Sequence, residues 1–255
     1  MEQLYLKARA KVNLTLAVLG KKDDGYHNLD SIFQKINLYD EMWIEKIEED
    51  KFILNSNIEN VKMQDNIIYK AYYKLKQEKP KLGGVKVILK KNIPMQAGLA
   101  GGSTDCASFL ITVNKLYNLK IKPKRLKEIA KSLGADVVPC MYNGAVLAKG
   151  IGENVKKINT HFKYYFVIVK PNFFCSTKEM YNKLDAKEIF QTPKSDEVIK
   201  ALEKNGAKAL LAGSGSCVFG IFKEKQEAKN AYNNLKKFYK TYICTSYNLR
   251  RNSFE

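Results

Sequence analysis

The residues best suited to chemistry form a glycine-rich segment, Gly98-Leu99-Ala100-Gly101-Gly102-Ser103-Thr104. It stands between an alternating apolar run that ends at Ile93-Pro94 and a helical pattern. Glycines let backbone N–H groups converge on an anion, and the N-terminus of the following helix adds roughly half a positive charge. The spacing matches neither the Walker motif nor the Rossmann fingerprint. It indicates a phosphate site, and the alternative is a turn that only packs the helix on the strand.

Other groups with chemical potential are scattered along the chain, and each has an ordinary explanation of its own. Gly213-Ser214-Gly215-Ser216 could bring more backbone donors to the same ligand or could be a hairpin turn. Lys11 and Asn13 share one face of an expected strand, and Asp136 follows a helix end, where a carboxylate often caps a turn. The pair Tyr26-His27 follows an Asp-Gly turn and is more often a packing pair than a ligand clamp.

The elements that must position these groups can be read from hydrophobic spacing. Val12, Leu14, Leu16 and Val18 alternate with polar residues, which predicts a half-buried strand with Lys11 and Asn13 on its polar face. Apolar residues at intervals of three and four predict helices. The expected elements are a helix from the N-cap Asp65 to near Pro80, a strand over 85–89, a helix over 106–117 and a helix from Pro123 to Gly134.

A second group of elements follows the β-prone run 163–169. Alternating strands and helices with short returns suit a split βαβ, ferredoxin-like α+β unit of roughly a hundred residues. The pattern therefore divides the chain into 1–158 and 159–255. The expected elements of the second part are a helix over 198–204, strands over 209–211 and 218–222, a helix over 224–238 and a strand over 242–245.

Composition limits the class of protein. The chain has 255 residues, of which 45% are hydrophobic and 27% charged, as in a globular protein of one large or two modest domains. Five widely spaced cysteines and the absence of a long apolar run favour a cytoplasmic protein that binds no membrane. The net charge of +18 would attract nucleic acid or a phosphorylated small molecule, but the basic residues are scattered and nearly all lysines, which favours a solvated surface.

Taken together and in order, the motifs resemble the GHMP superfamily, the small-molecule kinases named after galactose, homoserine, mevalonate and phosphomevalonate. The resemblance rests on Lys11-Val12-Asn13-Leu14, Asp24-Gly25-Tyr26-His27, Pro94 to Thr104, Gly134-Ala135-Asp136-Val137 and Gly213-Ser214-Gly215. It implies a two-domain α+β fold. The N-terminal domain would resemble domain 2 of ribosomal protein S5, the C-terminal domain would be ferredoxin-like, and the active site would lie in the cleft between them.

Within that superfamily, Asp24 to His27, Gly134 to Val137 and Gly144 to Glu153 are similar to the family that acts on the cytidine diphosphate ester of methylerythritol. This resemblance implies transfer of the ATP γ-phosphoryl group to the 2-hydroxyl of that ester in the non-mevalonate isoprenoid pathway. The expected cofactors are ATP and Mg²⁺, with no metal ligands assigned. The expected partners are these small molecules and not nucleic acid, and the chain would be a monomer or a homodimer.

The same resemblance implies roles for individual residues. Asp136 would accept the proton, Lys11 would stabilise charge, and Asn13 would orient the hydroxyl. Tyr26 and Tyr181 would stack on the cytosine, and His27 would bond its polar edge. The residues expected to hold ATP are Pro94, Met95, Gln96, Ala97, Gly98, Leu99, Ala100, Gly101, Gly102, Ser103 and Thr104, together with Gly213, Ser214 and Gly215.

Three alternatives remain open on the sequence. Another GHMP kinase, of the mevalonate or homoserine type, would share the glycine segment but would not need an aromatic clamp. An RNA-binding module of the S5 type would bind RNA in a salt-sensitive way without ATP turnover. A relative without activity would still bind nucleotide, although Lys11, Asn13 and Asp136 are all present.

Overall fold

The structure is a computed structural model that describes residues 3–23, 25, 27–59, 61–160, 162–173 and 193–248. Its first layer is a six-stranded sheet in the order β3-β4-β2-β5-β6, with β1 paired to β2 beside that path. In the described part of the chain, no helix combines the length and apolar character needed to cross a membrane. The strands of this sheet are β1 (Gln3–Lys21), β2 (His27–Ile47), β3 (Phe52–Ser56), β4 (Gly84–Lys90), β5 (Ala145–Gly150) and β6 (Asn154–Ile158).

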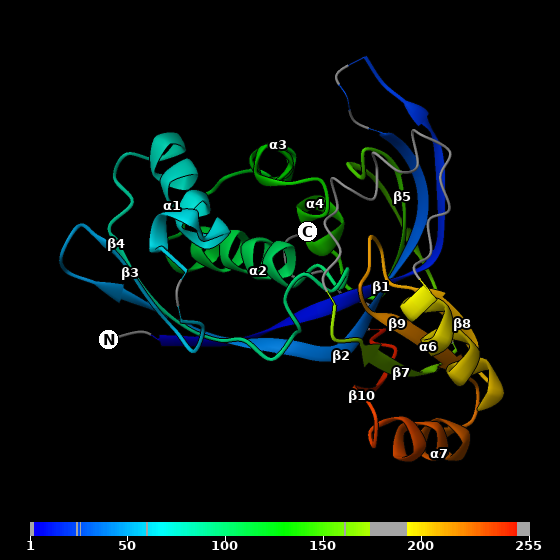
Figure 1. Cartoon of the computed structure of the whole chain (residues 1–255). Helices are drawn as coiled ribbons and strands as arrows, with labels where there is room; N and C mark the ends of the chain where they lie inside the picture. Colours follow the sequence, from blue (N-terminus) through cyan, green and yellow to red (C-terminus); the bar gives the residue numbers. More distant parts are fainter. Residues whose placement is uncertain are drawn as a thin grey trace.

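Helices cover one face of this sheet (Figure 1). The apolar stripes of the helices meet the buried side chains of β2, β4 and β5 in one core. Burial of these stripes is the main force that holds helix against sheet. The helices are α1 (Ile67–Glu78), α2 (Gly101–Leu116), α3 (Pro123–Leu133) and the short α4 (Val137–Cys140).

The start of two helices differs from the sequence prediction. The N-cap of α1 is Asn66, whose side chain accepts a hydrogen bond from the N–H of Ile68 at 2.9 Å, and Asp65 instead ends a 3₁₀ turn (Met63–Asp65). Either residue type can cap a helix, so the sequence could not choose between neighbours. Helix α2 begins at Gly101, inside the glycine segment and five residues before its predicted stripe. Helix α3 ends before Gly134, as predicted.

Strand β1 was predicted correctly in type but not in burial. Lys11 and Asn13 lie on the same face, as the alternation predicts, yet both are buried, and Leu16 is 39% exposed. Irregularities in the β1–β2 pairing fall on either side of this stretch, between Arg9 and Lys11 and between Asn13 and Thr15. Polar side chains at this point are therefore enclosed by tertiary structure, which periodicity alone does not reveal.

The second part of the chain is a four-stranded antiparallel sheet in the order β10-β7-β9-β8. With helices after the first and third of these strands in chain order, this is the topology of a split βαβ, ferredoxin-like unit. The expectation for fold class is confirmed, although α6 begins earlier and α7 ends earlier than predicted. The elements are β7 (Tyr165–Lys170), α6 (Pro193–Lys204), β8 (Lys208–Leu211), β9 (Val218–Phe222), α7 (Lys225–Leu235) and β10 (Lys240–Thr245).

The two sheets share an apolar cluster, which we call the junction cluster. It joins side chains of β1, β2 and the segment 93–99 to side chains of the second sheet. The chain after β10 also returns to β2, where the N–H of Tyr247 donates to the carbonyl of Lys35 at 2.8 Å. Buried members of the junction cluster are Ala10, Val12, Ile36, Ile93, Ala97, Leu99, Phe166, Ile168, Ala212, Cys217, Phe219 and Cys244.

Candidate active site

A cavity of about 1760 Å³ opens where the two parts of the chain meet. Residues of β1, the segment 94–103, Asp136 and the loop 213–215 all line it. Pockets for one small molecule usually measure about 300–1000 Å³, so this cavity has room for two ligands side by side. Segments far apart in the sequence therefore form one site.

Lys11 and Asp136 lie together on the wall of this cavity. Lys11 Nζ is 3.3 Å from Asp136 Oδ2 and donates a hydrogen bond to Asn13 Oδ1 at 2.7 Å. The Lys11 side chain is 4% exposed and that of Asp136 is 35% exposed, so the carboxylate is the member of the pair that faces open space. Asn13 in turn donates through Nδ2 to Ser31 Oγ at 2.8 Å, which fixes the orientation of its amide.

This arrangement can move a proton next to a phosphate. A carboxylate open to the cavity can accept the proton of an alcohol held within hydrogen-bond distance. A buried ammonium beside it can attract the oxygens of a transferring phosphoryl group. Two contacts hold the Lys11 ammonium in place: the hydrogen bond to Asn13, and the ring of Phe33, whose centroid lies 4.6 Å from Nζ.

The glycine loop, defined as residues 94–104, also lines the cavity, through residues 94–103. Gln96, Gly98 and Ala100 have positive φ angles of 50°, 73° and 55°, so the backbone turns sharply before α2 begins. Amides of the first turn of a helix lack partners within the helix, which leaves those of Gly101, Gly102 and Ser103 available to an anion. The loop is fixed to β1, because Leu99 accepts a hydrogen bond from the N–H of Lys11 at 3.2 Å.

The second loop, residues 213–215, contacts the glycine loop directly. A Cβ added to Gly98 would lie 1.6 Å from the carbonyl oxygen of Ala212, and one added to Gly213 would lie 3.0 Å from the carbonyl oxygen of Gly98. Such an approach is open only to glycine. Both loops and Lys11 thus meet at one point, since the same added Cβ of Gly213 would lie 3.5 Å from Lys11 Nζ.

The close contact at Gly98 yields a testable prediction. In Gly98→Ala the new methyl group overlaps the Ala212 carbonyl, so the two loops must separate. If these loops hold ATP, as the sequence motifs predict, ATP affinity should fall at least about tenfold. Gly206→Ala is the matched control, because Gly206 also has a positive φ, 86°, but an added Cβ meets nothing within 4 Å. Calorimetric titration with Mg-ATP measures both variants. Equal ATP affinity in the two variants would contradict the role assigned to this contact.

His27 and Thr104, both expected at the site, differ in their relation to the cavity. His27 is buried and lines the cavity, whereas Tyr26 and Tyr181 lie outside the described residues. Thr104 does not line the cavity: its hydroxyl donates to the carbonyl of Arg9 at 2.6 Å and accepts from Lys35 Nζ at 2.7 Å. The helix has already turned at Thr104, so its side chain points to β1 and β2 and not to the loop. The rest of the expected ATP residues, 94–103 and 213–215, line the cavity.

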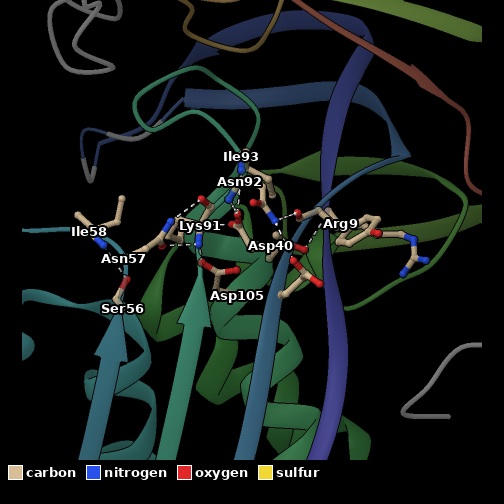
Figure 2. A network of polar contacts seen from close by, with 12 residues as sticks. Arg9, Asp40, Ser56, Asn57, Ile58, Lys91, Asn92, Ile93 and Asp105 are labelled. Carbon is tan, nitrogen blue, oxygen red and sulfur yellow. Dashed lines mark hydrogen bonds and ion pairs between the residues drawn. The ribbon is translucent and has the colours of Figure 1, made fainter.

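Charged residues that sequence reasoning missed lie behind the glycine loop. Lys91 donates to Asp105 Oδ2 at 2.6 Å and to Asp40 Oδ2, and Asp40 Oδ1 accepts from the N–H groups of Asn92 and Ile93 at 2.6 and 2.8 Å (Figure 2). Lys91 and Asp105 line the cavity. The exposed Lys90 and the partly buried Glu41 stand next to them in the sequence, so composition gave no signal of burial.

A further buried lysine, Lys35, lies near Lys11. Lys35 donates to the carbonyl of Arg9 at 2.8 Å and to Thr104, and burial lowers the pKa of its ammonium below the ordinary range. Among the described residues, no group of three or more His, Cys, Asp or Glu side chains could hold a metal ion.

Comparison with protein families agrees with this fold and site. The family profile described as GHMP kinases N terminal domain matches residues 66–144, and the one described as GHMP kinases C terminal matches residues 180–241. The chain therefore has the fold of a GHMP kinase, a class of phosphotransferases, as the sequence motifs predicted.

Individual relatives identify the family within the GHMP kinases to which the chain belongs. A 4-diphosphocytidyl-2-C-methyl-D-erythritol kinase of Alkaliphilus oremlandii is 37% identical, with 97% of this chain and 98% of that one covered. One of Caldicellulosiruptor saccharolyticus is 38% identical, with 95% and 96% covered. The chain belongs to the family of 4-diphosphocytidyl-2-C-methyl-D-erythritol kinases.

Solved structures give the same result. The crystal structure of a 4-(cytidine 5'-diphospho)-2C-methyl-D-erythritol kinase is similar at a TM-score of 0.81 and 26% identity, covering 96% of this chain and 99% of that one. A homoserine kinase of Cytophaga hutchinsonii has a TM-score of 0.75 at 17% identity, covering 97% of this chain and 96% of that one, and shows the shared fold alone.

Proposed function

We propose that this chain transfers the γ-phosphoryl group of ATP to the 2-hydroxyl of 4-diphosphocytidyl-2-C-methyl-D-erythritol, giving the 2-phosphate and ADP. The observation that carries the proposal is the contact of 3.3 Å between Lys11 and Asp136 on the wall of a cavity that the glycine loop also lines. Family membership supplies the acceptor. Because ATP and this acceptor are water-soluble metabolites, we place the reaction in the cytoplasm.

In the proposed mechanism Asp136 acts on the acceptor hydroxyl and Lys11 acts on the phosphoryl group that is transferred. Asp136 accepts the proton of the 2-hydroxyl while a bond forms between that oxygen and the γ-phosphorus. The bond from the γ-phosphorus to the bridging oxygen breaks, and its electron pair leaves with ADP. Lys11 stabilises the negative charge that spreads over the phosphoryl oxygens, and Asn13 keeps the Lys11 ammonium aimed at the cavity.

The glycine loop is proposed to bind the triphosphate through backbone amides and the N-terminus of α2. Mg²⁺ bound with ATP supplies charge neutralisation at the phosphates. Ser103 is the loop residue we propose to approach the metal, because it lines the cavity with a hydroxyl oxygen, a ligand type that Mg²⁺ accepts. The 213–215 loop closes the site from the second part of the chain.

The cytidine end of the acceptor is proposed to lie beyond Lys11, along β1 and β2. His27 forms a hydrogen bond with the polar edge of the cytosine, and Tyr26 and Tyr181 stack on its faces. Stacking of a base on aromatic side chains contributes about 1–3 kcal/mol. The position of His27 in the cavity wall supports this direction. In this proposal residues 1–158 carry the ATP loop and residues 159–255 complete the cleft, in a monomer or a homodimer.

An assay of ADP release across candidate alcohols tests the proposal. We expect Mg-ATP and the cytidine diphosphate ester to give steady turnover, and mevalonate and homoserine to give none above the ATPase background. A coupled spectrophotometric assay measures ADP, and phosphorus NMR identifies the 2-phosphate. Turnover of mevalonate or homoserine instead would overturn the acceptor, and salt-sensitive RNA binding without ADP release would favour the RNA-binding alternative.

A further inference from the structure

The buried charges behind the glycine loop connect both ends of that loop to one strand. Asn92 and Ile93 immediately precede Pro94, the first residue of the loop, and their N–H groups donate to Asp40 Oδ1. Asp105 lies in the second turn of α2, after the loop, and shares the Lys91 ammonium with Asp40. Asp40 is on β2, in the middle of the sheet. The entry and the exit of the loop are thus joined through one cation.

Lys91 also lies close to the first residue of α2. A Cβ added to Gly101 would lie 3.2 Å from Lys91 Nζ, which places the ammonium against the backbone that opens the helix. The side chains of this triad are almost completely buried, with 9% exposure for Lys91, 0% for Asp40 and 3% for Asp105. Water therefore does little to screen these charges, and their geometry is fixed by one another.

Lys91 carries the positive charge of the triad. Burial lowers the pKa of Lys91, but the carboxyl groups of Asp105 and Asp40 raise it by more, so the lysine remains an ammonium. Burial raises the pKa of Asp105 well above its usual range, the Lys91 ammonium opposes this effect, and Asp40 adds to it. The single ammonium thus holds both carboxyl groups in one contact network behind the glycine loop.

We propose that Lys91 and Asp40 are positioning residues for ATP, which hold the backbone amides of the glycine loop at the spacing that the triphosphate requires. The proposal rests on the proposed kinase function. Neither side chain needs to touch the nucleotide: Asp40 fixes the loop entry through two N–H groups, and Lys91 fixes the start of α2 through Asp105. Misplacement of the loop weakens ATP binding and leaves the cytidine end of the cavity unchanged.

Lys91→Met tests this role, because it keeps the length of the side chain and removes the shared cation. We expect the dissociation constant and the KM for Mg-ATP to rise about tenfold or more, while the KM for the cytidine ester stays within about threefold. Lys90→Met is the matched control: Lys90 is the preceding residue, 57% exposed, and pairs only with Glu41 among the described residues. An exposed pair contributes little, so ATP affinity should stay within about twofold.

A second variant covers the case in which Lys91→Met does not fold. Asp40→Asn keeps the shape and an acceptor oxygen for the N–H groups of Asn92 and Ile93 but removes the ion pair, and we expect the same selective loss of ATP affinity. A lower melting temperature with unchanged ATP affinity in both variants would mean that the triad only stabilises the fold, and would overturn the proposal. Equal changes in the KM values of ATP and the acceptor would overturn it as well.

Measurements of ATP binding and turnover on the wild-type chain distinguish a failure of this inference from a failure of the proposed function. ATP binding without turnover of the cytidine ester refutes the acceptor assignment. The ATP affinities of the wild type and the Lys91 and Asp40 variants then still test the role of the triad. A wild-type chain that does not bind ATP at all overturns both proposals.

Discussion

Asp136→Asn is expected to lower kcat by about 10³-fold or more, because it removes the group that we propose accepts the proton of the alcohol. The amide has nearly the same shape as the carboxylate, so the cavity should keep its form. In the proposed mechanism ATP binds at the glycine loop, so its dissociation constant should change little. Steady-state kinetics with the cytidine ester, together with calorimetric titration of Mg-ATP, measures the two effects separately.

Asp30→Asn is the matched control for this variant. Asp30 lies on β2, its side chain is 34% exposed against 35% for Asp136, and it pairs with Lys149 at 3.1 Å. The same chemical change at similar exposure should leave kcat unchanged. Undiminished turnover in Asp136→Asn would remove this carboxylate from the mechanism, whereas equal losses in both variants would point to a general effect of charge.

Lys11→Met is expected to lower kcat by about 10²–10³-fold, a loss typical of removing one preorganised group that stabilises transition-state charge. Methionine fills the space of the lysine stem, and the hydrogen bond from the Lys11 backbone N–H to Leu99 does not depend on the side chain. The loop should therefore stay attached to β1. Single-turnover phosphoryl transfer measures the chemical step without interference from product release.

Lys7→Met serves as the control on the same strand. Lys7 is exposed and lies over the ring of Tyr39, 4.5 Å from its centroid, away from the cavity. It should retain full activity. If Lys11→Met transfers the phosphoryl group at the wild-type rate, the ammonium has no part in the reaction and only the geometry of Asp136 remains to be explained.

Local pattern was sufficient to predict most elements of the fold. The two-residue period placed Lys11 and Asn13 on one face, and the succession of strands and helices after residue 163 predicted the topology of the second sheet. The exposure of these faces could not be predicted, because residues far along the chain cover Lys11 and leave Leu16 open. The helix cap at Asn66 was missed because Asp65 beside it fits the same preference.

The candidate site also has parts that the sequence could predict and parts that it could not. The glycine loop and the Gly134-Ala135-Asp136 motif are local and could be recognised as such. The triad of Asp40, Lys91 and Asp105 is formed by three residues from a strand, a loop and a helix, and no spacing in the sequence relates them. Thr104 belongs to the glycine motif but faces away from the cavity, since only the helical geometry decides where its side chain points.

The junction cluster has a consequence for how ligands reach the site. Its apolar side chains come from both sheets, and members such as Ala97 and Leu99 belong to the glycine loop itself. Swinging the two halves apart about a hinge would expose this surface to water, which is unfavourable. Nucleotide and acceptor are therefore expected to enter an assembled crevice through its mouth, with rearrangement restricted to side chains and surface turns.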